Sequence, residues 1–179
     1  MSPYPPLKTK DVSYNNGNRQ KPSDHDVLDM IGLYYQETGR ILAKTELKRD
    51  LEECPWVIAK CGEAIIGFAT TGEFSPDVLR LDNLFVRNDC RNQKIGFEML
   101  NLLETIAPKR FRYIILDNSR LYEYPSGGIV DKKPAVDFYM KKYFNQADNS
   151  KFERAFETGE TYVLFKKLPN GSKVPEPWR

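Results

Sequence analysis

The amino-acid sequence predicts an α/β (α+β) fold, with a mixed, mostly antiparallel sheet, a central parallel strand pair and helices on both faces. Two helical patterns open the chain, three strand patterns follow in succession, and the middle then has the order strand, loop, helix, strand. A strand–helix–strand unit of this kind requires a right-handed crossover, which makes its two strands parallel. Because amphipathic helices must bury one side, we expect helices against both faces of the sheet.

The first half of the chain contains two helical patterns and then three strands. Ser23 or Asp24 can cap a helix in which apolar residues recur at helical spacing up to Gly39. A tight turn at 61–63 joins two of the strands as a hairpin. The elements predicted here are helices over 24–39 and 41–53 and strands over 56–59, 64–71 and 78–86.

The second half alternates helices with strands. The polar segment Arg87–Ile95 shows no helical or strand period, and the helix after it begins at Gly96 and ends before Pro108. We expect a long loop over residues 117–133. The elements predicted here are helices over 96–107 and 134–142 and strands over 113–116, from 143 onward and over 161–168.

The composition excludes several classes of function. Of the 179 residues, 40% are hydrophobic and 29% are charged, the balance of a globular protein with one domain. The 27 basic and 25 acidic side chains nearly cancel, so we expect no nucleic acid as a partner. No apolar run is long enough to span a membrane, so we expect no membrane partner. The single histidine and three cysteines show no metal-ligand spacing, so we expect no metal.

The two ends of the chain differ from its middle. Residues 1–23 predict a flexible N-terminal arm or an irregular first strand, residues 24–168 one folded domain, and residues 169–179 a flexible C-terminal tail. Residues 1–20 lack the apolar stretch of a secretory signal, so the cytoplasm is the expected compartment. The oligomeric state stays open, with a homodimer as one option.

The segment with the clearest chemistry joins the third predicted strand to the helix that begins at Gly96. Backbone N–H groups at a helix N-terminus lack partners within the helix, and with the helix dipole they bind phosphate. A glycine there allows a ligand to approach closely. Arg91 and Lys94 can add positive charge for a diphosphate. The alternative is an ordinary loop in which Gly96 only eases packing.

This segment resembles the acetyl-CoA signature of the GNAT family of N-acetyltransferases. In that signature a strand ending Leu-aromatic-Val leads to Arg/Gln-x-x-Gly-x-Gly/Ala at a helix start. Residues 84–86 match the strand end, Arg91 the first motif position and Gly96 the last, whereas Lys94 stands at the family's first glycine. If this position has a positive φ, a lysine costs about 1 kcal/mol there, which a salt link to phosphate could offset.

A second segment also resembles the family. Residues 135–144 are similar to its later helix, Ala-x-x-x-Tyr-x-x-x-Gly-Phe, with Tyr139 in register and Tyr143 in place of the glycine. The resemblance covers residues from about 24 to 168 and identifies this range as an N-acetyltransferase domain.

The resemblance implies an acetyl-CoA-dependent N-acetyltransferase that transfers an acetyl group to a primary amine by direct attack in a ternary complex. A strand backbone N–H, that of Phe85 or Val86, would hold the thioester carbonyl. Loop amides would hold the pyrophosphate of acetyl-CoA, the co-substrate. The implied loop residues are Arg91, Asn92, Gln93, Lys94, Ile95 and Gly96.

The resemblance also implies catalytic residues. Tyr139 would protonate the departing thiolate. The alternative is that Tyr139 is an aromatic residue of the core with no role in catalysis. An alkyl amine has a pKa of about 10.4, so a base or a desolvating pocket must supply its neutral form. Asp82 is the candidate base, with Glu73 and a water relay as alternatives.

Two rival functions belong to other classes. A GNAT-fold protein without turnover would act as a CoA-binding regulator, which Lys94 favours and Tyr139 disfavours. An unrelated α/β nucleotide-binding domain is disfavoured because neither GxxxxGK[ST] nor GxGxxG is present. The amine acceptor, small molecule or protein, cannot be identified from the sequence.

The long segment 117–133 exceeds the usual connection of about 2–6 residues and follows the carboxyl end of a strand, where ligands bind in open α/β sheets. We expect it to fold over the acetyl end of the cofactor site, with Tyr122 or Tyr124 lining the acceptor pocket. A surface insertion is the alternative.

Overall fold

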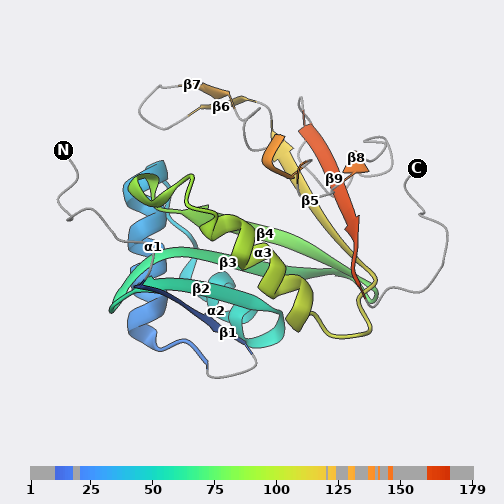
Figure 1. The fold of residues 1–179 in the computed structure, drawn as a ribbon, viewed down its shortest axis with the longest axis horizontal. Helices are drawn as coiled ribbons and strands as arrows, with labels where there is room; N and C mark the ends of the chain where they lie inside the picture. Colours follow the sequence, from blue (N-terminus) through green and yellow to red (C-terminus); the bar gives the residue numbers. More distant parts are fainter. Residues whose placement is uncertain are drawn as a thin grey trace. The chain divides into compact units, whose positions relative to one another are not determined.

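The structure, a computed structural model, describes residues 11–17, 21–119, 121–123, 129–131, 137–139, 141, 145–146 and 161–169. Its helices and strands are shown in Figure 1. In chain order they are β1 (Val12–Asn16), α1 (Asp24–Thr38), α2 (Lys44–Glu53), β2 (Trp56–Cys61), β3 (Ala64–Ser75), β4 (Val78–Val86), a 3₁₀ helix (Asn88–Cys90), α3 (Ile95–Ile106), β5 (Tyr113–Ser119), β6 (Leu121–Glu123), β7 (Ile129–Asp131), β8 (Asn145–Gln146) and β9 (Thr161–Lys167).

The strands form a mixed sheet, as predicted. Its order is β1-β2-β3-β4-β5-β9-β8, and β6 pairs separately with β7. β4 and β5 are parallel, whereas β1–β2, β2–β3, β5–β9 and β8–β9 are antiparallel. The fold class predicted from the sequence is therefore confirmed, including the parallel pair on either side of the α3 crossover.

The chain packs as two compact units. The first consists of Met1–Gly72 and Leu81–Pro108, and the second of Glu73–Arg80 and Lys109–Arg179. β3 and β4 each pass from one unit into the other, so the two units share these strands.

In the first unit, α1 begins and ends where the sequence predicts. The Ser23 hydroxyl accepts a hydrogen bond from the Asp26 N–H (3.1 Å), and the Asp26 carboxylate accepts one from the Ser23 N–H (3.1 Å), which completes a capping box. Gly39 ends the helix with a φ of 70°, a conformation that suits glycine. α2 begins at Lys44, later than predicted, and Ile41 is 76% exposed in the connection before it.

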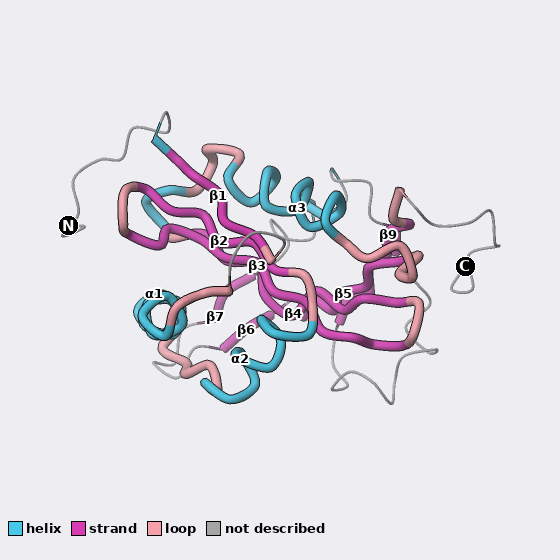
Figure 2. The backbone as a smooth tube through the Cα atoms, turned by 90° about the horizontal axis from the view of Figure 1, so that it is seen from below, coloured by secondary structure: helices cyan, strands magenta, loops and turns pink. Residues whose placement is uncertain are grey.

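Helices cover both faces of β1–β4 in the first unit. Figure 2 shows α3 on one face and α1 and α2 on the other. Buried apolar residues of α1 and α2 form one core with β2 and β3; its members are Val27, Met30, Leu33, Leu47, Leu51, Trp56, Ile58, Ile65 and Phe68. Burial of this amphipathic face, rather than helix propensity alone, stabilises the short α2.

β1 decides between two alternatives for the N-terminal segment. Residues Val12–Asn16 pair antiparallel with β2 along their whole length, so this part of residues 1–23 is a strand. Residues 1–10 and 18–20 lie outside the described residues.

In the second unit, β5 lies between β4 and β9. Val78–Arg80 pair in parallel with Tyr113–Ile115, and β9 runs antiparallel to all seven residues of β5. Apolar β5 residues up to Leu116 are buried, as their continuous apolar run predicts.

The prediction of a loop over 117–133 was wrong in part. β5 continues to Ser119, because β9 supplies ladder partners beyond the apolar run that marked the strand in the sequence. β6 and β7 then form a short antiparallel pair inside the predicted loop. Tyr122 belongs to β6, and Tyr124 lies outside the described residues, so their proposed role stays a prediction.

The later elements follow the predicted order where they are described. Asp137–Tyr139 are helical, within the helix predicted over 134–142. β9 covers Thr161–Lys167, nearly the predicted strand, and the predicted C-terminal tail lies outside the described residues except for Pro169. None of the helices in the described parts of the chain has both the length and the apolar character to cross a membrane.

Candidate active site

The end of β4 is held in register by β3. The Asn83 side-chain amide donates a hydrogen bond to the Thr70 hydroxyl (2.8 Å), and the Arg87 N–H donates one to the Ile66 carbonyl (2.9 Å). These two pairs have the same sum of residue numbers, as an antiparallel hairpin requires. Between them, the Phe68 and Phe85 rings stack with centroids 5.9 Å apart.

This register decides which backbone amide of β4 can meet a ligand. In a strand, both backbone polar groups of a residue point to one neighbour, and those of the next residue point to the other side. Because Arg87 bonds to β3, Phe85 also faces β3, and Val86 directs its N–H away from β3. Of the two predicted amides, the geometry therefore favours Val86 over Phe85.

Gly67 of β3 lies unusually close to the same stretch of β4. A Cβ added at this position would lie 2.8 Å from the Phe85 carbonyl oxygen and 3.2 Å from the Met99 Cε of α3. Real Cβ atoms do not approach backbone oxygen so closely, so a side chain here would displace β4. The position of the Val86 amide thus depends on a glycine in the neighbouring strand.

The loop after β4 contains two residues in the left-handed conformation. Lys94 has a φ of 63° and Asn92 a φ of 64°. Lys94 therefore carries the cost that the sequence attached to a positive φ at this position. A positive φ was not predicted for Asn92 from the sequence. Its residue type was the available signal, because asparagine enters the left-handed conformation more readily than most residues other than glycine.

The N-terminus of α3 lacks the side-chain cap that α1 has. Its N-cap residue is Lys94, whose side chain makes no capping hydrogen bond, and the first intrahelical bond runs from the Glu98 N–H to the Lys94 carbonyl (3.0 Å). By helix geometry, the N–H groups of Ile95 and Gly96 therefore have no acceptor within the helix. Together with the helix dipole, this arrangement suits an anion such as pyrophosphate.

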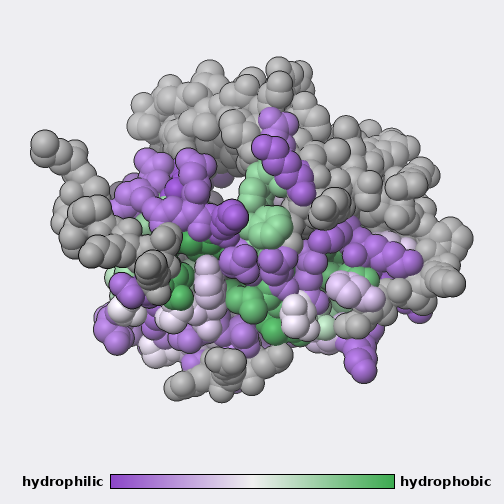
Figure 3. Space-filling model, viewed as in Figure 1, coloured by the Kyte–Doolittle hydropathy of each residue, from purple (hydrophilic) through white to green (hydrophobic). Residues whose placement is uncertain are grey.

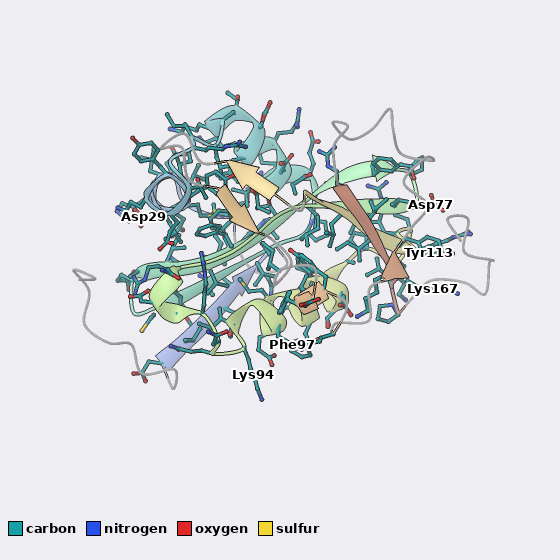
Figure 4. The ribbon with its side chains drawn as sticks, turned by 90° about the horizontal axis from the view of Figure 1, so that it is seen from above. Asp29, Asp77, Lys94, Phe97, Tyr113 and Lys167 are labelled. Carbon is teal, nitrogen blue, oxygen red and sulfur yellow. The ribbon has the colours of Figure 1, made fainter. Side chains whose placement is uncertain are left out.

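The loop is also polar and accessible. Asn88, Asp89, Arg91, Asn92 and Lys94 are exposed, and Figure 3 shows hydrophilic residues where Figure 1 draws the β4–α3 loop. The Lys94 side chain extends away from the ribbon in Figure 4. Lys94 is therefore an exposed cation on the residue that precedes α3.

Arg91 contacts the last two residues of β4. Its Nε donates a hydrogen bond to the Val86 carbonyl (3.0 Å), and its guanidinium carbon lies 5.9 Å from the centroid of the Phe85 ring. Its Nη2 lies 3.6 Å from the Glu37 carboxylate of α1. The side chain is still 49% exposed, so it can also meet a phosphate.

Sequence comparison assigns these features to a family. Residues 24–124, more than half of the chain, match the family model described as Acetyltransferase (GNAT) family. The chain belongs to the GNAT family of acetyltransferases. Among curated proteins, none matches the sequence.

Solved structures of GNAT proteins share the fold. An acetyltransferase from Streptococcus agalactiae has a TM-score of 0.67 at 14% identity, over 89% of this chain and 99% of that one. A GNAT acetyltransferase from Bacillus cereus has a TM-score of 0.65 at 15% identity, over 87% and 97%. An N-acetyltransferase of Escherichia coli, named for an alanine of a ribosomal protein, has a TM-score of 0.64 at 14% identity, over 93% and 100%.

The cysteine in this GNAT loop is an unreactive thiol. Cys90 is fully buried in the 3₁₀ helix, and its thiol donates to the Asp89 carboxylate (3.2 Å), which also accepts from the Arg87 Nε (2.6 Å). Burial, followed by the Asp89 hydrogen bond, raises the pKa of Cys90 to about 11. The thiol is therefore neutral at physiological pH, which argues for a structural role.

The predicted catalytic residues of the GNAT mechanism lie on different elements. Asp82 is half-buried on β4, on the face opposite Asn83. Glu73 forms an exposed salt bridge with Arg110 (2.6 Å) in the second unit. Tyr139 also belongs to the second unit, where its half-buried ring meets Phe138 edge-on at 5.3 Å. The first unit thus contains Asp82 and the predicted acetyl-CoA loop, and the roles of all these residues stay predictions.

Among the described residues, no three His, Cys, Asp or Glu side chains gather as a metal site requires.

Proposed function

We propose that this GNAT protein is an acetyl-CoA-dependent N-acetyltransferase that transfers an acetyl group to a primary amine, in the cytoplasm. The observation that carries the proposal is the start of α3, where a left-handed Lys94 leaves the helix without a side-chain cap beside the end of β4. An uncapped helix start can bind an anion through its free N–H groups, and the pyrophosphate of acetyl-CoA would provide one.

The residues of the first unit would bind and orient acetyl-CoA. The N–H groups of Ile95 and Gly96 would donate to the pyrophosphate, and Arg91 and Lys94 would add positive charge. The Val86 N–H, directed away from β3, would donate to the thioester carbonyl and to the oxyanion that develops when the amine attacks. These donors are fixed before the substrate arrives, which lowers the barrier without reorganisation.

Proton transfer would complete the reaction. The amine must lose a proton before or during attack, to Asp82 or to water, and the departing CoA thiolate would take a proton from Tyr139. The acceptor site stays open; amines of small molecules, lysine side chains and protein N-termini all fit this chemistry. The E. coli neighbour, named for a ribosomal-protein alanine, supports including a free peptide N-terminus in the acceptor panel.

Two measurements test the proposal. Titration calorimetry with CoA and acetyl-CoA should show binding to the purified protein, and release of free thiol from acetyl-CoA should depend on one class of amine in a panel. Absence of CoA binding would refute the proposal. Binding without thiol release for any amine would instead favour a CoA-binding regulator.

A further inference from the structure

Glu37, on the last turn of α1, reaches across to the loop after β4. Its Oε1 accepts a hydrogen bond from the Asn88 N–H (3.1 Å), the first residue of the 3₁₀ helix. Its Oε2 lies 3.6 Å from Arg91 Nη2. The Glu37 side chain is 20% exposed, whereas its partners Asn88 and Arg91 are exposed, so water screens these contacts in part. One carboxylate therefore contacts the loop at two points.

The contact between Glu37 and Arg91 is one of several interactions that link α1 to the end of β4 and the loop after it. Arg91 donates to the Val86 carbonyl, and Val86 follows Phe85, whose ring lies 5.6 Å from that of Tyr34 on α1. α1 therefore contacts the end of β4 through Tyr34 and Phe85, and the loop after β4 through Glu37 and Arg91. Both contacts fix the segment from which the proposed thioester and pyrophosphate donors extend.

We infer that Glu37 is a positioning residue for acetyl-CoA, holding the β4–α3 loop in the conformation that binds the pyrophosphate. The inference rests on the proposed function. A carboxylate near an anion site repels the anion, so a residue without a positioning role would weaken binding merely by its presence. Here the shorter contact, 3.1 Å, is to the Asn88 backbone, and the longer one, 3.6 Å, is to Arg91. The inference therefore requires that the loop held by Glu37 strengthens binding by more than the repulsion weakens it.

Two conservative variants separate the effect of the length of the Glu37 side chain from the effect of its charge. Glu37→Asp keeps the charge but shortens the side chain by one methylene, which withdraws the carboxylate from the Asn88 N–H. Glu37→Gln keeps the length and an acceptor oxygen but removes the charge. The matched controls are Glu63→Asp and Glu63→Gln, at an exposed glutamate in the turn between β2 and β3 of the same unit.

Calorimetry with CoA, which needs no turnover, gives the first readout. We expect Glu37→Asp to bind CoA about tenfold more weakly and Glu37→Gln about threefold more weakly, because a neutral acceptor retains part of a charge-assisted hydrogen bond. Both Glu63 variants should bind as the wild type does. Amide hydrogen exchange at Asn88 should be faster in Glu37→Asp than in Glu37→Gln. In turnover, the Michaelis constant for acetyl-CoA should rise while kcat changes little.

The outcomes distinguish the inference from the proposed function. If the wild type binds no CoA, the proposed function fails and the inference fails with it. If the wild type binds CoA but Glu37→Asp binds it equally well or more tightly, or if Glu37→Gln is weaker than Glu37→Asp, the inference alone is overturned. The expected order, wild type tightest and Glu37→Asp weakest, supports it.

Discussion

Replacing Lys94 by glycine should stabilise the fold and weaken CoA binding at once. Lys94 has a φ of 63°, where a residue with a Cβ costs about 1–2 kcal/mol relative to glycine. Glycine gives back about 0.4–1 kcal/mol because it makes the unfolded chain more flexible. The net expectation is a gain of about 0.5–1 kcal/mol in the free energy of unfolding. For a chain of this length, that corresponds to a rise in Tm of about 1–4 °C.

A matched variant separates the two effects. Lys94→Ala removes the ammonium group but keeps a Cβ at the same φ, so it should bind CoA as weakly as Lys94→Gly with no gain in stability. Urea unfolding of the three proteins, followed by circular dichroism, measures stability, and calorimetry with CoA measures affinity. If Lys94→Gly is no more stable than Lys94→Ala, the left-handed lysine stores no strain, and the reasoning is refuted.

Three other substitutions or treatments test separate parts of the site. Gly67→Ala should destabilise the protein by about 1–3 kcal/mol and lower kcat, because its Cβ would displace the Phe85 carbonyl and with it the Val86 amide; unchanged unfolding would contradict the close approach. Iodoacetamide at pH 8 should leave Cys90 unmodified in peptide mass spectra, with reactivity appearing as the pH nears about 11, where the buried thiol ionises. Tyr139→Phe should lower kcat about 10²-fold without changing CoA affinity if the hydroxyl is the general acid, and equal turnover would assign the ring to packing.

The sequence predicted most elements of the fold because their signals are local. Ser23 and Gly39 mark the ends of α1 by their own chemistry, and the crossover around α3 requires β4 and β5 to be parallel. The extension of β5 to Ser119 was missed because β9, distant in the sequence, supplies the hydrogen bonds of its last residues. The pairing of β6 with β7 was missed for a similar reason, since a three-residue strand carries almost no periodic signal.

The candidate site was predictable to a similar extent. The motif located an exposed loop between β4 and α3 that contains Arg91 and Lys94, and it attached a cost to a positive φ at Lys94, which the structure shows. The role of this loop in binding acetyl-CoA stays a prediction. The choice between Phe85 and Val86 required the register of β4 against β3, which only tertiary hydrogen bonds reveal. The contact of Glu37 with the loop could not be predicted from the sequence, because Glu37 lies 51 positions from Asn88, whose N–H donates to it.

These observations together suggest how the loop keeps its shape without the family's first glycine. Two left-handed residues, Asn92 and Lys94, together cost about 2 kcal/mol or more, less for asparagine than for lysine. The hydrogen bonds from Asn88 to Glu37 and from Arg91 to Val86 contribute about 0.5–1.5 kcal/mol each, and more where a charge takes part. The two sums are of the same size, so contacts to α1 and β4 are sufficient to offset the strain.

On this reasoning the loop conformation depends on tertiary contacts, and the Glu37 substitutions should disturb it more in this chain than in a version carrying Lys94→Gly. The double variant Glu37→Asp with Lys94→Gly should therefore bind CoA less weakly than the sum of the two single losses predicts.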